Sequence, residues 1–168
     1  MPEKQTLQRA RRDKREGKAP STQAGEFIRE EMHHIREGRH GARSPQQAIA
    51  IGLSKARRSG VDLPAPKPGT TSTATREKAQ RDLERGHGAR PKRKSTARRS
   101  RASKTALKRE SRAAASPRAL ARQARTAAGR RTPAQRSAAA RKASRTKGPA
   151  TRSAAAKKAA RTRSRGGR

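Results

Sequence analysis

The first clear alternation of apolar and polar positions lies between residues 21 and 38. At about 100° per residue, one arc gathers the apolar side chains with a single acid: Ala24, Phe27, Ile28, Glu31, Met32 and Ile35. The charged and imidazole side chains fall outside that arc: Glu26, Glu30, His33, His34 and Arg36. After Pro20, Ser21 or Thr22 can cap a helix, and Gly38 can close it. The pattern predicts an amphipathic helix with one buried face.

A second helical segment begins at Ser44-Pro45-Gln46-Gln47. Serine at the N-cap, proline at the first helical position and glutamine two positions later form a strong start signal. Gly60 is placed for the left-handed residue that ends a helix. Ile49 and Leu53 share a face and Ile51 points the opposite way, so the first half of this helix is expected to be buried on two sides.

The remaining helix start and stop signals divide the first 90 residues further. Residues 1–20 read as a charged arm, 21–63 as a helical hairpin module, 64–72 as a stiff proline-rich linker and 73–90 as a weak helix. Beyond alanine, these 90 residues offer only about a dozen large apolar side chains, so the module is marginal as a monomer. We therefore expect a homodimer through residues 22–59.

Short motifs recur in this half of the chain. Arg15-Glu16-Gly17, Arg36-Glu37-Gly38 and Glu84-Arg85-Gly86 each end a helical pattern, and His-Gly-Ala-Arg occurs at 40–43 and again at 87–90. The recurrence indicates a decayed helix–turn–helix repeat.

The net positive charge is concentrated after residue 90. The chain of 168 residues carries a net charge of +35, but residues 1–90 account for only +9 of it. Residues 91–168 contain 27 bases and one acid, Glu110, and the only aromatic residue of the protein is Phe27. Low hydrophobicity with high net charge leaves too little apolar burial to offset conformational entropy. The fold class expected is mostly α: a small helical module followed by a disordered, helix-prone basic tail at 91–168.

The tail contains a repeat of sixteen residues. Pro117, Pro133 and Pro149 are evenly spaced, and Arg-Ser-Ala-Ala-Ala-Arg-Lys-Ala at 136–143 matches Arg-Ser-Ala-Ala-Ala-Lys-Lys-Ala at 152–159. Each proline follows an acceptable N-cap, and the runs between them consist of strong helix formers. Isolated helices of this length are marginal, and like charges repel, so we expect the helices to form on binding a polyanion.

Two resemblances follow from these residues. Residues 47–57, Gln-Ala-Ile-Ala-Ile-Gly-Leu-Ser-Lys-Ala-Arg, resemble the core of a family of small basic bacterial proteins with no assigned function. Ser116-Pro117-Arg118 and the alternating Ala-Ala-Ala-Lys-Lys make the tail similar to linker-histone C-terminal domains and to bacterial histone-like proteins. The second resemblance implies compaction of DNA rather than reading of its sequence.

Duplex DNA is the polyanion that fits best. Binders of single-stranded or structured RNA stack bases on aromatic side chains, and membrane binding needs large apolar residues, whereas the tail has only Leu107 and Leu120. The expected function is sequence-independent, histone-like DNA binding in the cytoplasm at the nucleoid. The expected phosphate-binding residues are Lys92, Arg93, Lys94, Arg98, Arg99, Arg101, Lys104, Lys108, Arg109, Arg136, Arg141, Lys142, Arg145, Lys147, Arg152, Lys157, Lys158, Arg161, Arg163 and Arg165.

Several alternatives stay open at this point. One is a structural, ribosome-associated RNA-binding protein, and another is an interaction module that its tail tethers to the nucleoid. A third is specific DNA reading by a helix–turn–helix at 22–59, although its turn is longer than usual. Pro91-Lys92-Arg93-Lys94 would be a nuclear import signal in a eukaryotic host.

The sequence gives little sign of catalysis, a cofactor or a metal. There is no cysteine, no secretory signal and no apolar run long enough to span a membrane. Glu30 and Glu31 are expected to face different ways, and so not to act on one atom; they are expected to pair with arginines of residues 9–15 or with the tail. The histidines, His33, His34, His40 and His87, are expected to be solvated, because no pair has the spacing of metal ligands on a helix. We therefore expect a non-enzymatic protein without cofactor.

Overall fold

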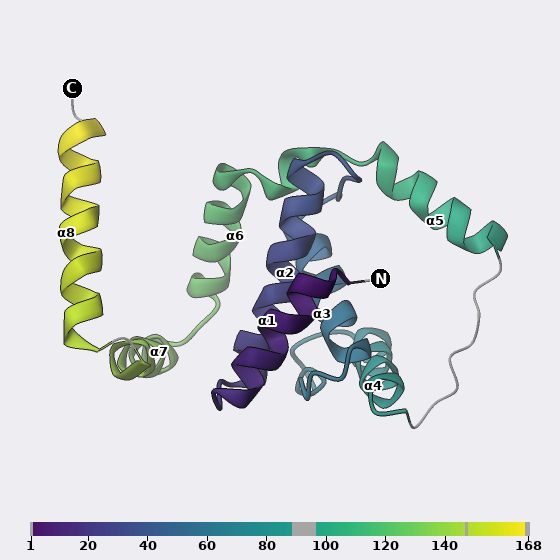
Figure 1. Cartoon of the computed structure of the whole chain (residues 1–168), viewed down its shortest axis with the longest axis horizontal. Helices are drawn as coiled ribbons and strands as arrows, with labels where there is room; N and C mark the ends of the chain where they lie inside the picture. The colour runs from purple at the N-terminus through teal and green to yellow at the C-terminus, as the bar shows by residue number, and fades with distance from the viewer. Residues whose placement is uncertain (1, 89–96, 147, 167–168) are drawn as a thin grey trace. The chain divides into compact units, whose positions relative to one another are not determined.

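The structure, a computed structural model, describes residues 2–88, 97–146 and 148–166. These residues form helices and no strand, which confirms the mostly-α prediction (Figure 1). The helices are α1 (Lys4–Arg15), α2 (Pro20–Arg36), α3 (Pro45–Arg58), α4 (Thr73–Gly86), α5 (Ala97–Arg109), the 3-10 helix η1 (Arg112–Ala115), α6 (Pro117–Gly129), α7 (Pro133–Thr146) and α8 (Pro149–Gly166). The chain divides into two compact units, Met1–Gln123 and Ala124–Arg168, and the division falls within α6.

The packing of α2 against α3 is at the centre of the first unit. Phe27 and Ile35 of α2 are completely buried. The buried stripe of α3 consists of small residues at every fourth position, Ala48, Gly52 and Ala56, while Ile49 and Leu53 are half-buried beside it. The buried face of α3 is therefore centred on these small residues and not on Ile49 and Leu53, which the sequence pattern favoured. Small residues let the backbones of two helices approach closely.

Two apolar clusters flank this contact. One joins Met32 and Ile35 to Ala48 and to Ala114 and Ala115 of η1, with Leu120 of α6 packed against it. The other cluster consists of residues from α1, α2, α3 and the loop after α3: Ala10, Ala24, Phe27, Ala56 and Val61. Both clusters draw on segments outside the hairpin at 21–63. Residues outside the hairpin thus contribute to both clusters, and the expected homodimer stays a prediction.

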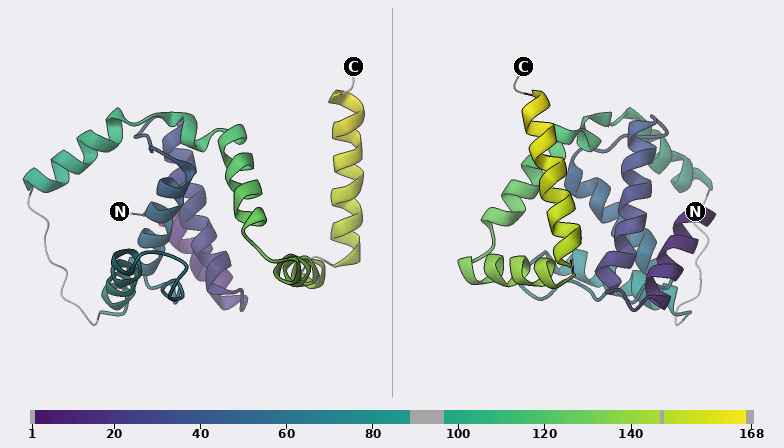
Figure 2. Two further views of the ribbon diagram at one scale, coloured as in Figure 1. Left: turned by 180° about the vertical axis from the view of Figure 1, so that it is seen from behind. Right: turned by 60° about the vertical axis from the view of Figure 1, so that its left-hand side comes forward.

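The N-terminal segment is a helix that packs on α2, which differs from the charged arm expected at residues 1–20 (Figure 2). Thr6, Ala10 and Asp13 of α1 are buried, and Nε of Arg9 lies 2.8 Å from Oε2 of Glu26. Helix α2 is therefore covered along a second side. This cover explains the burial of polar residues that the apolar arc did not include.

Three predictions about those polar residues are wrong. Glu30 and His34 lie in the interior, with 3% and 8% of their surface exposed, although both were placed on the solvent side. Glu30 and Glu31 converge on one atom, Nζ of Lys55, at 3.4 and 2.6 Å. His33 alone on this helix fits the expectation of a solvated histidine.

Most of the helix start and end signals in the sequence coincide with helix ends in the structure. Ser44 Oγ accepts a hydrogen bond from the backbone N–H of Gln47, and Gly38 and Gly60 have positive φ angles of 78° and 85°. Helix α2, however, begins at Pro20 with Ala19 as its N-cap, two residues before Ser21, the first of the expected caps. The glycine with positive φ that follows α4 is Gly88 rather than Gly86, because Gly86 lies against the backbone of Arg57.

Arg57 holds the residues after α3 in place. Its guanidinium is buried and donates from Nε to the carbonyl oxygen of Leu63 and from Nη2 to that of Pro64, both at 3.1 Å. Burial lowers the pKa of Arg57, and the charge of Asp82 on α4 opposes that shift. The proline-rich stretch therefore leaves α3 along a fixed path, and α4 then packs back on α3.

The part of the basic segment that the structure describes, residues 97–146 and 148–166, is largely helical, so the expected disorder is not shown. Helices α5 and α6 and η1 lie wholly or partly in the first unit, and α7 and α8 follow in the second. The compositional boundary near residue 90 is thus not the boundary of the packed unit, because Ala114, Ala115 and Leu120 supply apolar surface that the charge count conceals. Among the described residues, no helix is long and apolar enough to cross a membrane.

Candidate nucleic-acid interface

The expected phosphate-binding residues fall on three helices. Helix α5 displays six of them, all exposed: Arg98, Arg99, Arg101, Lys104, Lys108 and Arg109. Those of α7 and α8 are also exposed: Arg136, Arg141, Lys142, Arg145, Arg152, Lys157, Lys158, Arg161 and Arg163. Arg165 belongs to α8, but its side chain is outside the description, and Lys92, Arg93, Lys94 and Lys147 lie outside the described residues.

The sixteen-residue repeat sets where these helices begin. Helices α6, α7 and α8 start at Pro117, Pro133 and Pro149. Proline suits the first helical position because its missing N–H has no partner there in any case. At α6 and α7 the residue before the proline caps the helix: Ser116 Oγ accepts from the N–H of Ala119 at 3.2 Å.

The cap of α7 is reciprocal. Thr132 Oγ1 accepts from the N–H of Gln135 at 3.2 Å, and Oε1 of Gln135 accepts from the N–H of Thr132 at 3.1 Å. This is the capping box, in which two otherwise unpaired helix N–H groups are satisfied. The repeat is therefore a set of helix start signals as well as a pattern of composition.

Helices α7 and α8 present a cationic surface on every side. No Asp or Glu follows Glu110 in the sequence. The residues at 124–145 and 148–164 are exposed, except that Ser144 is partly covered. At 100° per residue, the six bases of α8 are spread around the helix rather than collected on one face. Such a helix can meet a polyanion in more than one rotational setting.

Helix α6 carries basic residues that the sequence analysis did not single out. Arg118, Arg122 and Arg125 are exposed and lie within about 60° of one another around the helix, whereas Leu120 lies opposite and packs on the core. Their spacing of four and three residues is the signal that could have identified them. The structure thus orients this stripe, because burial of Leu120 turns it outward.

The acids of the first unit have basic partners close by. Asp13 pairs with Lys18 at 2.7 Å, and Glu26 pairs with Arg9. Asp62 pairs with Lys14 and with His87, both at 3.1 Å. These acids are paired with bases within residues 3–87. The C-terminal helices therefore carry most of the positive excess of the protein.

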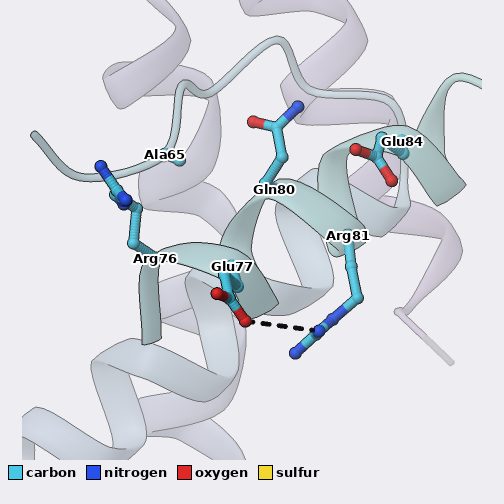
Figure 3. A pocket seen from close by; sticks show the side chains of 6 residues that line it. All are labelled: Ala65, Arg76, Glu77, Gln80, Arg81 and Glu84. Atoms are coloured by element: carbon cyan, nitrogen blue, oxygen red, sulfur yellow. Dashed lines mark ion pairs between the residues drawn. The ribbon is translucent and has the colours of Figure 1, made fainter. Parts of the chain in front are cut away.

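A shallow depression of about 490 Å³ lies beside α4 (Figure 3). Its lining is formed by Ala65 and by polar residues of α4: Arg76, Glu77, Gln80, Arg81 and Glu84. An ion pair of 3.8 Å between Nη1 of Arg81 and Oε2 of Glu77 runs along one side. The lining side chains combine two arginines with two glutamates and one glutamine, and include no Ser, Cys or His.

Comparison of the chain with protein-family models, with curated proteins and with solved structures gives no match. The functional argument therefore depends on the residues and geometry of this chain.

Proposed function

We propose that the protein is a non-enzymatic, largely sequence-independent binder of duplex DNA that neutralises phosphates with the basic side chains of α5 to α8. The observation that supports this proposal is the pair of helices α7 and α8, which are solvent-exposed, rich in Arg and Lys, and free of acidic residues. Association with the bacterial nucleoid is part of the proposal.

Helix formation brings the charges of the tail closer to the spacing of DNA charges. Duplex DNA presents one negative charge per about 1.7 Å of axis. Helix α8 has 18 residues and six bases, so a length of about 27 Å carries a positive charge every ~4.5 Å. The same residues in an extended chain would carry one every ~10 Å. The helical form is thus the better counterion for a duplex.

Binding and helix formation are coupled in this proposal. Among the side chains that the structure describes, α7 and α8 bury none, so caps and intrinsic propensity stabilise these helices, and repulsion between their like charges opposes them. Phosphates remove that repulsion. We propose that residues 124–168 are largely unfolded in the free protein and adopt the helices of the structure on DNA.

Arginine content favours phosphate as the target group. Eleven of the fifteen bases in residues 124–168 are arginine, whose planar guanidinium matches two oxygens of a phosphate at once. Phe27, the only aromatic residue, lies fully buried between α1, α2 and α3 and cannot stack on a base. Duplex DNA, bound by charge and shape, fits these features better than single-stranded RNA.

The test compares two charge variants of the full-length protein. In the first, six exposed bases of α7 and α8 become glutamine: Arg136, Arg141, Arg145, Lys157, Lys158 and Arg161. In the control, six exposed bases of the first unit become glutamine: Lys4, Arg11, Arg15, Arg43, Lys67 and Lys78. Both variants lose the same net charge, so they differ only in where it is lost.

The readout is the dependence of binding on salt concentration, measured with duplex DNA. If the six tail bases each neutralise a phosphate, their loss reduces the slope of log K against log salt by up to ~5, at about 0.9 per contact. The control is expected to retain nearly the whole slope. Equal slopes for the two variants would refute the proposal. Tighter binding to structured RNA than to duplex DNA at equal salt would favour the ribosome-associated alternative instead.

A further inference from the structure

A cluster of two histidines and a buried carboxylate lies in the first unit. One ligand atom each from Glu31, His34 and His40 lies within 4.8 Å of the others. Glu31 has 1% of its surface exposed and His34 has 8%, and the side chain of His40 is largely covered. By contrast, the side chain of His33 on the same helix is 63% exposed and pairs with Glu37.

Local chain geometry brings these three side chains together. Glu31 and His34 are one turn apart on α2 and so share a face. After α2 the chain turns at Gly38, which has a φ of 78°, and returns His40 toward that face. Gly41 then donates its N–H to the carbonyl oxygen of Leu107 at 2.8 Å, and a side chain at this position would overlap the carbonyl oxygen of Glu110. The position of His40 is therefore fixed from both sides.

The hydrogen bonds of His40 leave a ligand atom facing a carboxylate. Its Nδ1 lies 3.0 Å from the carbonyl oxygen of Gly41, which can only accept, so Nδ1 carries a proton. In a neutral ring, Nε2 then has a lone pair, and this lone pair faces Oε1 of Glu31 at 3.1 Å. Two acceptors at that distance need a cation between them, either a proton on Nε2 or a metal ion. An N–H bound to a backbone carbonyl is also the usual second contact of a metal-binding histidine.

The ion pair with Lys55 uses one oxygen of Glu31 and leaves the other available as a metal ligand. Nζ of Lys55 pairs with Oε2 of Glu31 at 2.6 Å, and this leaves Oε1, which faces His40, for a metal ion. Around the three candidate ligands, the carboxylates of Glu3, Glu30 and Glu31 outnumber the permanent cations of Arg39 and Lys55. With neutral imidazoles, the cluster has a net negative charge that a bound cation would balance.

We propose that Glu31, His34 and His40 bind a divalent transition-metal ion of the zinc class, with a fourth coordination position open to water. Two imidazoles and one carboxylate are a common ligand set for Zn²⁺. Ligand atoms around a tetrahedral Zn²⁺ lie about 3.4 Å apart at bond lengths near 2.1 Å. The three candidate ligand atoms already lie within 4.8 Å of one another, so small side-chain movements would bring them to one ion. The ion would tie the loop that carries His40 and Gly41 to α2, and through Gly41 it would stabilise the contact with residues 107–111.

The test uses the untagged full-length protein, freed of metal with a chelator, and ZnCl₂ as the probe. Calorimetric titration at about pH 7.5 is expected to give one Zn²⁺ per chain. His34→Gln and His40→Gln are each expected to lose at least about tenfold in affinity. His33→Gln is the matched control, because it removes the neighbouring imidazole of the same helix, and it is expected to bind as tightly as the unaltered protein.

A second measurement needs no variant and so is independent of whether the variants fold. The chain has four histidines and no cysteine, so the imidazole nitrogens can be followed individually by ¹⁵N NMR. Addition of Zn²⁺ is expected to shift the ring nitrogens of His34 and His40 and to leave those of His33 and His87 unchanged. The proposal is overturned if His40 stays doubly protonated with Zn²⁺ in excess, if no binding is detected, or if all four rings shift alike.

Discussion

Gly52 of α3 lies directly against the backbone of Ile28 in α2: a Cβ on Gly52 would be 2.8 Å from the Cα of Ile28 and 3.0 Å from its nitrogen. A backbone atom cannot move aside as the end of a flexible side chain can. The separation of the two central helices is thus set at this one position, and any side chain there must push α2 and α3 apart.

Gly52→Ala is therefore expected to destabilise the protein, although alanine is the better helix former. Overpacking of this kind costs about 1–3 kcal/mol, which exceeds the gain of about 1 kcal/mol in helix propensity. Gly25→Ala is the control, since a Cβ at Gly25 of α2 meets no atom within 4 Å, and it is expected to be neutral or stabilising. Urea denaturation of both variants measures the difference. Equal stabilities would mean that the two helices are not in close contact at Gly52.

Lys55→Met is expected to be strongly destabilising in metal-free protein, because it leaves the buried carboxylates of Glu30 and Glu31 without their shared cation. Removal of one partner from a buried charge group costs about 3–5 kcal/mol. The double variant Lys55→Met with Glu31→Gln is expected to recover part of that loss, while Lys78→Met on the exposed face of α4 changes little. A Lys55→Met protein as stable as the Lys78→Met control would show that the carboxylates are compensated otherwise.

Lys18 provides a test at alkaline pH. Hydrogen bonds from its ammonium group to Asp13 and then to Glu16 raise the pKa of Lys18 above its ordinary value of 10.5. Because the folded pKa is the higher one, this contribution to stability is fully present below pH 10.5 and is lost as the pH rises through the folded pKa. Lys18→Gln is expected to be less stable than the unaltered protein at about pH 8, with a difference that shrinks once the pH exceeds the ordinary pKa of 10.5.

Chemical denaturation across that pH range checks the prediction for Lys18. The control is Lys4→Gln at the exposed start of α1. A difference for Lys18→Gln that stayed constant from neutral to strongly alkaline pH would mean that its charge is not what stabilises the turn between α1 and α2.

Proline substitution tests whether helix formation contributes to DNA binding. Ala139→Pro with Ala155→Pro places a breaker inside α7 and inside α8 at about 3 kcal/mol per site, without changing the charge. Circular dichroism is expected to show a gain of helix when duplex is added to the unaltered protein and a smaller gain in this variant, with weaker binding. Ala139→Ser with Ala155→Ser keeps both N–H groups and serves as the control. If the proline variant binds as tightly as the serine variant, charge alone accounts for the affinity.

The sequence by itself determined several of the helix starts. Ser44-Pro45, Thr132-Pro133 and the even spacing of Pro117, Pro133 and Pro149 each predicted a helix start that the structure has. These signals act between residues a few positions apart: a cap satisfies N–H groups of its own first turn, and proline restricts its own φ. The excess of cations after residue 90 is likewise a property of composition alone.

Only the tertiary structure decided which polar groups are buried and where the packed unit ends. The periodicity of α2 assigns Glu30 and His34 to solvent, and it is the cover provided by residues 3–15 and by Lys55 of α3 that buries them. In the same way, composition assigns Ala114, Ala115 and Leu120 to a polycationic segment, whereas in the structure they pack with Met32 and Ile35. The physical reason is that burial depends on which distant segments meet, and a single helix's periodicity reports only that it has an apolar side.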